Sequence, residues 1–70
     1  MPLVIAPINQ ELRIINILCN DKTRKHLESL GITINSVITV LSSTGGNVVL
    51  KVKEGRLALD STIATGIVVA

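Results

Sequence analysis

Short runs of Val, Ile and Leu, each bounded by residues that favour turns, recur along the whole 70-residue chain. In the clearest run, Val48 to Lys53, apolar and polar side chains alternate, so Val48, Leu50 and Val52 would share one face. Such alternation is typical of a strand that packs one face on a core. β-branched residues also pack well on a pleated sheet and lose side-chain freedom in helices. The pattern therefore predicts a mainly β fold.

Five such runs are separated by turn signals. The predicted strands span Leu12 to Leu18, Val37 to Ser42, Val48 to Lys53, Arg56 to Leu59 and Gly66 to Val69. In the first strand the alternation slips by one residue between Ile14 and Ile15, which indicates either a bulge or a strand buried on both faces. A meander of five strands that closes on itself would remove exposed edges. We therefore expect one domain over residues 1–70, a small five-stranded SH3-like barrel.

One short helix is expected after the first strand, from Lys22 to Leu30. Asn20 or Asp21 can cap its start, and Gly31 follows its end, where a left-handed residue is favoured. A helix this short needs docking, which we assign to Leu27 and Leu30.

A single helical turn from Asp60 to Ala64, capped by Asp60 or Ser61, is expected before the last strand. Residues 43–47, with Gly45 and Gly46, predict a flexible hairpin loop. Glu54 and Gly55 predict a tight turn in which Gly55 has positive φ. In the N-terminal segment, Leu3 and Ile5 are free to pack on the core.

Composition limits the classes of function. The chain has no Phe, Tyr or Trp and a net charge of only +2, so it lacks both the stacking platforms and the dense basic stripe of nucleic-acid binders. Cys19 is the only cysteine, which excludes an intrachain disulfide and fits a reducing compartment. The first residues lack a basic signal-peptide region, and no apolar run approaches the roughly 20 residues that span a bilayer. We expect a cytoplasmic protein that is not embedded in a membrane.

Several motifs, in order and over nearly the whole chain, resemble the FeoA family of ferrous-iron transport proteins. They are the basic helix with its Leu-Gly ending (Arg24 to Ile32), the strand Val37 to Leu41, the hairpin Leu50 to Leu59 and the closing segment Ala64 to Val69.

The chain also departs from the family pattern. Ile8-Asn9 and Ile34-Asn35 stand where the family tends to have Pro-Gly, and Asn tolerates the left-handed backbone region that such a turn needs. The loop from Thr44 to Asn47 lacks the family's common proline, and Asp60 stands where the family often has a basic residue. These last two differences bear on which partner this member prefers.

The resemblance implies a small cytosolic accessory or regulator of bacterial ferrous-iron uptake. The partner it implies is FeoB, a membrane transporter with a cytosolic G-protein domain. The same module resembles the C-terminal domain of DtxR-type metal-dependent repressors. A stand-alone module of that kind, a nucleic-acid-binding small barrel and a homo-oligomeric scaffold remain the alternatives.

Candidate sites for chemistry are few. Cys19 and His26, with Asp21 or Glu28, could form only a loose metal site, because one His and one Cys do not supply the ligand set that ferrous iron favours. The sequence offers no set of a nucleophile, a base and a group that orients the base. We therefore expect no catalytic, metal-binding or cofactor-binding residues.

The best candidate for partner contact is the polar face of the short helix, with Lys22, Arg24 and Lys25 above Leu27 and Leu30. Its simpler interpretation is a solvated face. A second candidate is an apolar cleft between this helix and the barrel.

Overall fold

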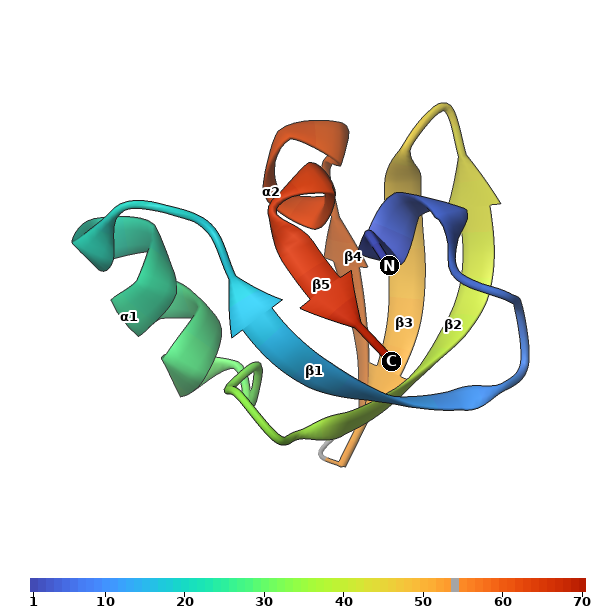
Figure 1. Ribbon diagram of the computed structural model, residues 1–70, viewed down its shortest axis with the longest axis horizontal. Helices are drawn as coiled ribbons and strands as arrows, with labels where there is room; N and C mark the ends of the chain where they lie inside the picture. The colour runs from blue at the N-terminus through green and yellow to red at the C-terminus, as the bar shows by residue number, and fades with distance from the viewer. Residues whose placement is uncertain (54) are drawn as a thin grey trace.

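The expected mainly β architecture, with a short helix after the first strand, is confirmed (Figure 1). The structure is a computed structural model and describes residues 1–53 and 55–70. In chain order its elements are the 3-10 turn η1 (Leu3–Ile5), β1 (Glu11–Ile17), α1 (Asp21–Ser29), β2 (Val37–Thr44), β3 (Asn47–Val52), β4 (Gly55–Leu59), α2 (Ser61–Thr65) and β5 (Ile67–Val69).

The strands form one antiparallel sheet in the order β4-β3-β2-β1-β5. The sheet curls strongly, but its end strands β4 and β5 are not hydrogen-bonded neighbours in this order. The expectation that closure removes the exposed edges is therefore wrong for the described residues. The barrel is partly open between β4 and β5.

The slip of the hydrophobic pattern in β1 is a bulge. The first part of β1 pairs with β2 and the second part with β5, and the register shifts between Ile14 and Asn16. Ile15, the extra residue, is 48% exposed, so the alternative of a strand buried on both faces is wrong. The bulge bends β1, so that its first part pairs with β2 and its second part pairs with β5.

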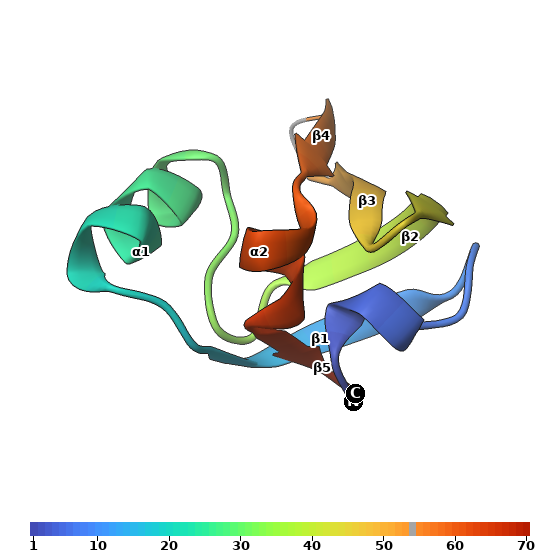
Figure 2. The same ribbon diagram turned by 90° about the horizontal axis from the view of Figure 1, so that it is seen from above.

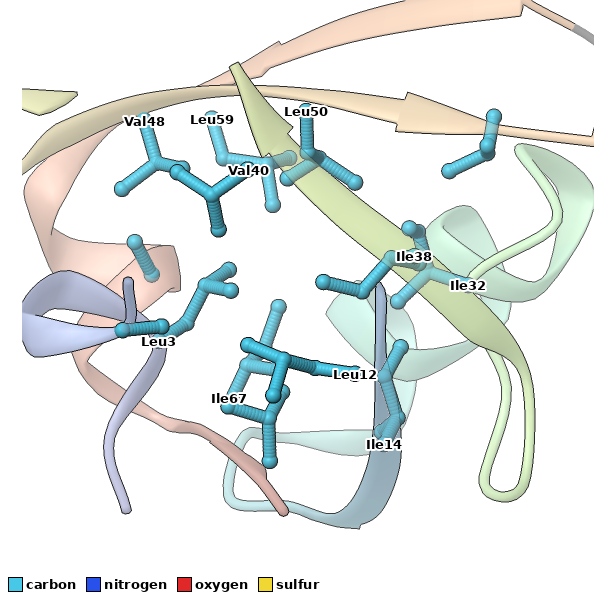
Figure 3. Close-up of a cluster of buried hydrophobic side chains, with 14 of the residues drawn as sticks. Leu3, Leu12, Ile14, Ile32, Ile38, Val40, Val48, Leu50, Leu59 and Ile67 are labelled. Carbon is cyan, nitrogen blue, oxygen red and sulfur yellow. The ribbon is translucent and has the colours of Figure 1, made fainter. Parts of the chain in front are cut away.

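The core is built from aliphatic side chains, and none of the described polar side chains is buried. Leu50, Ile38 and Ile14 come from three different strands and all belong to this core (Figure 3). Leu3 packs into this core as expected, whereas Ile5 is 68% exposed. Because a 3-10 turn advances about 120° per residue, side chains two positions apart point to different sides. The expectation for Ile5 is therefore wrong.

Turn chemistry accounts for the connections. Asn20 Oδ1 accepts from the Thr23 N–H at 2.8 Å, and Asp60 Oδ1 accepts from the Ile63 N–H at 2.9 Å, which confirms both helix caps. The expected five-residue loop after β2 is instead a two-residue turn. Gly45 and Gly46 have φ of 60° and 84°, as a type I′ turn requires. Gly55 has the expected positive φ, while Glu54 lies outside the described residues.

The β3–β4 hairpin gives a test of register. Leu59 is buried and Leu57 is half-buried against the core. We expect Leu59→Ala to lower the free energy of unfolding by about 2–5 kcal/mol, and Leu57→Ala to lower it by less. Urea denaturation of both variants measures this. A nearly neutral Leu59→Ala would contradict the register.

A second test concerns the contact that joins β5 to β1. A Cβ added to Gly66 would clash with the carbonyl oxygen of Leu18, although its φ is ordinary. We expect Gly66→Ala to cost about 3 kcal/mol, at the upper end of the usual cost of overpacking, because backbone atoms cannot move aside as a side chain can. The matched control is Gly45→Ala, which meets open space but has positive φ and should cost roughly 1–2 kcal/mol. Thermal unfolding followed by circular dichroism compares them, and equal losses would contradict the steric explanation.

Candidate docking surface

Helix α1 stands to one side of the barrel and joins it through its two connecting segments (Figures 1 and 2). It ends in a Schellman motif, because the Gly31 N–H donates to the Glu28 carbonyl at 3.0 Å and the Ile32 N–H donates to the Leu27 carbonyl at 2.9 Å. This motif commonly brings together the apolar side chains at its two outer positions, here Leu27 and Ile32. Both are buried, at 1% and 0% exposure. They are the side chains that anchor the helix end.

This arrangement partly corrects the sequence assignment. Leu27 is an anchor as expected, but Leu30 is only half-buried and Ile32, which we did not assign, takes the deeper position. The signal was present in the sequence, because an apolar residue directly after a C-terminal glycine is the mark of a Schellman motif.

The three basic residues of α1 have different roles. Arg24 Nη2 donates to the Ile17 carbonyl at 2.9 Å, and the side chain is half-buried, so it ties the helix to the end of β1. Lys22 and Lys25 are exposed. The polar face therefore presents two lysines, while Arg24 serves mainly to position the helix.

The segment between α1 and β2 is held firmly against β1. Asn35 has φ of 76° and its N–H donates to the Ile14 carbonyl at 2.7 Å, while Arg13 Nη1 donates to the Asn35 carbonyl at 3.0 Å. Asn9 also has positive φ, at 63°. Asn thus occupies the left-handed region at both places where the sequence departs from Pro-Gly. The backbone path beside α1 is fixed by hydrogen bonds to β1.

The candidate metal ligands lie apart from any built site. Cys19 is half-buried against the core, whereas His26, Asp21 and Glu28 are exposed. Among residues 1–53 and 55–70, no group of three or more His, Cys, Asp or Glu side chains is placed to hold a metal ion. The absence of metal, cofactor and catalytic residues stays a prediction.

A hollow of about 370 Å³ separates the end of α1 from the start of β4. It adjoins a second hollow of about 510 Å³ on the outer face of β1, β2 and β3, and Gly31 and Val52 line both. We call the first hollow the α1–β4 groove; its lining is Glu28, Ser29, Leu30, Gly31, Val52, Gly55, Arg56 and Leu57. The groove lies where the cleft beside the helix was expected. Its walls combine half-buried leucines with charged side chains at the rim.

In the part of the chain that the structure describes, no helix has both the length and the apolar character needed to cross a bilayer.

Comparison with solved structures agrees with this architecture. The chain superposes with a TM-score of 0.87 on the crystal structure of an iron uptake regulatory protein (FeoA), at 27% identity over 99% of this chain and 93% of that one. For the solution structure of the FeoA protein from Chlorobium tepidum, the TM-score is 0.86 at 18% identity, over 99% of this chain and 68% of that one.

A manganese-dependent transcriptional repressor shares the fold, with a TM-score of 0.85 at 18% identity over 96% of this chain and 39% of the repressor. No curated protein matches the sequence. The FeoA domain family model matches residues 1–70. The chain therefore belongs to the FeoA domain family.

Proposed function

We propose that this protein is a cytoplasmic accessory of ferrous-iron uptake that regulates the transporter FeoB by binding its cytosolic part. Family membership over residues 1–70 supports the iron-uptake context. The similar crystal structure is that of an iron uptake regulatory protein. The observation that carries the binding mode is the position of α1, which stands beside the barrel (Figure 2). The helix is anchored at its end by the buried Leu27, and its residues Lys22 and Lys25 are exposed.

Anchoring makes α1 suitable for recognition. The Arg24 bond to Ile17 and the buried Leu27 fix the helix before a partner arrives, so little conformational entropy is lost on binding. Lys22 and Lys25 then offer two exposed positive charges to an acidic surface. Charges of this kind mainly increase the association rate and make it depend on salt.

Binding is favoured over catalysis by the chemistry available. The single histidine, His26, is exposed on α1, and Cys19 is half-buried against the core. A nucleophilic mechanism needs a base within hydrogen-bond reach and a group that orients it. Neither residue has a side-chain hydrogen bond among those found between described residues.

A charge reversal on α1 tests the proposal. We expect Lys22→Glu combined with Lys25→Glu to slow association with the cytosolic part of FeoB by about tenfold and to reduce its salt dependence, because the steering charges are inverted. Surface-based binding kinetics at two ionic strengths, with FeoB in both nucleotide states, measure this. Arg24 is left unchanged because it positions the helix.

The matched control is Lys22→Arg with Lys25→Arg, which keeps both charges and should bind like the parent. Circular dichroism verifies that all variants are folded. Unchanged kinetics in the folded Glu variant would show that the polar face of α1 is exposed to solvent and does not contact FeoB. No binding by the parent in either nucleotide state would contradict the FeoB proposal itself.

The proposal also predicts how the protein behaves toward iron. Without a convergent ligand set among the described residues, we expect ferrous iron to bind weakly or not at all. Anaerobic titration calorimetry of the parent, Cys19→Ser and His26→Ala should give the same result for all three. A one-to-one complex of sub-micromolar Kd that either substitution abolishes would show an iron site and contradict a purely regulatory role.

A further inference from the structure

The two edges of the sheet are covered differently. At β5, the Val69 N–H donates to the Met1 carbonyl and the Met1 nitrogen donates to the Val69 carbonyl, both at 2.7 Å, and Pro2 forms a bridge with Val68. At β4, among residues 1–53 and 55–70, no backbone or side-chain hydrogen bond from outside the sheet reaches the strand. The chain thus covers the β5 edge with its own backbone and leaves the β4 edge open.

The register shows which groups this edge presents. Val52 pairs with Gly55, and two residues of the chain lie between them. Residues that flank a two-residue connection form a hydrogen-bonded pair. Pairs in an antiparallel ladder alternate between bonded and non-bonded. Leu57 therefore bonds to β3, whereas Arg56 and Ala58 direct their N–H and C=O groups away from it. Both residues are exposed.

The α1–β4 groove lies beside this edge, since Gly55, Arg56 and Leu57 form one wall and the end of α1 forms the other. An added strand would meet two kinds of surface. On one face it would pass the half-buried Leu57 and Leu30, and on the other it would pass the exposed Arg56. Successive side chains of a strand point to opposite faces. The groove therefore fits a segment in which apolar residues alternate with polar ones.

Charge identifies the polar residues of that segment. Lys51 and Arg56 are direct cross-strand partners, and like charges placed opposite one another destabilise a sheet. Glu11 belongs to the same row of cross-strand partners, but Thr39 of β2 lies between it and Lys51. A carboxylate on an added strand would stand next to Arg56 at the open end of this row. The adjacent positive charges of Lys51 and Arg56 therefore favour an acidic residue beside Arg56 on an added strand.

We propose that the outer edge of β4 accepts an extended segment of a partner protein, with alternating acidic and apolar residues, as a sixth strand. Main-chain hydrogen bonds to Arg56 and Ala58 supply affinity. Contacts of the apolar residues with Leu30 and Leu57, and of the acidic residues with Arg56, supply specificity. The proposal goes beyond the contact assigned to α1, because it concerns another surface and does not require FeoB as the partner.

Amide hydrogen exchange measured by NMR on the full chain tests the docking. The probe is an end-blocked seven-residue peptide of alternating valine and glutamate, and the control peptide carries lysine in place of glutamate. We expect the glutamate peptide to slow exchange at Arg56 and Ala58 by about tenfold or more and to leave Leu57 nearly unchanged. The lysine peptide should have little effect.

Ala58 provides a matched pair of variants. Ala58→Pro removes an N–H that faces away from β3, and proline is tolerated at such edge positions. Ala58→Thr keeps the N–H and suits a strand. We expect the Thr variant to bind the glutamate peptide like the parent and the Pro variant to bind at least about tenfold more weakly, with circular dichroism verifying the fold.

Three outcomes would overturn the proposal. The glutamate peptide could bind Ala58→Pro as well as the parent, or give no protection at Arg56 and Ala58 in the parent. Alternatively, sedimentation could show self-association that Ala58→Pro abolishes and the peptide does not affect, which would make a second copy the occupant of the edge. If Ala58→Pro does not fold, protection in the parent decides the question alone.

Discussion

β1 is the strand on which the rest of the structure depends, because it joins the end strand β5 to the other strands of the sheet through β2. Its first part bonds to β2 and its second part to β5, and the bulge at Ile15 provides the bend between them. The same strand accepts the Asn35 N–H at Ile14 and the Arg24 guanidinium at Ile17. Just beyond it, the Leu18 N–H donates to the Gly66 carbonyl at 2.7 Å. The backbone of β1 and the residue after it therefore determine the positions of β5, of the segment before β2 and of helix α1.

This dependence explains why the barrel has a groove. α1 is located by hydrogen bonds to the backbone around β1 and by two buried side chains, Leu27 and Ile32, and it does not lie flat on the sheet. The end of the helix therefore stays apart from β4, and Leu30 and Leu57 are left half-buried on either side of the space. Deeper packing of α1 would bury more apolar area and add stability, but it would close the groove and cover the β4 edge.

Much of the fold was predictable because its signals are local. Alternation located every strand to within about two residues, and the caps at Asn20 and Asp60 follow from short side chains next to free N–H groups. The missed features depend on geometry that forms only on folding. Arg24 looks like any helical surface cation until Ile17 is brought beside it. Likewise, whether β4 and β5 close on each other depends on the accumulated curl of the whole sheet, which no single motif records.

The absence of aromatic residues connects the core to the candidate surfaces. Small barrels that bind proline-rich peptides use grooves lined by aromatic side chains, and this chain has none. Among residues 1–53 and 55–70, the sixteen buried apolar residues are all aliphatic and already belong to the core. Affinity for a partner must then come from groups other than aromatic rings. The exposed lysines of α1 and the main-chain groups along the outer edge of β4 are two such sources. Both lie outside the part of the molecule that is packed around β1.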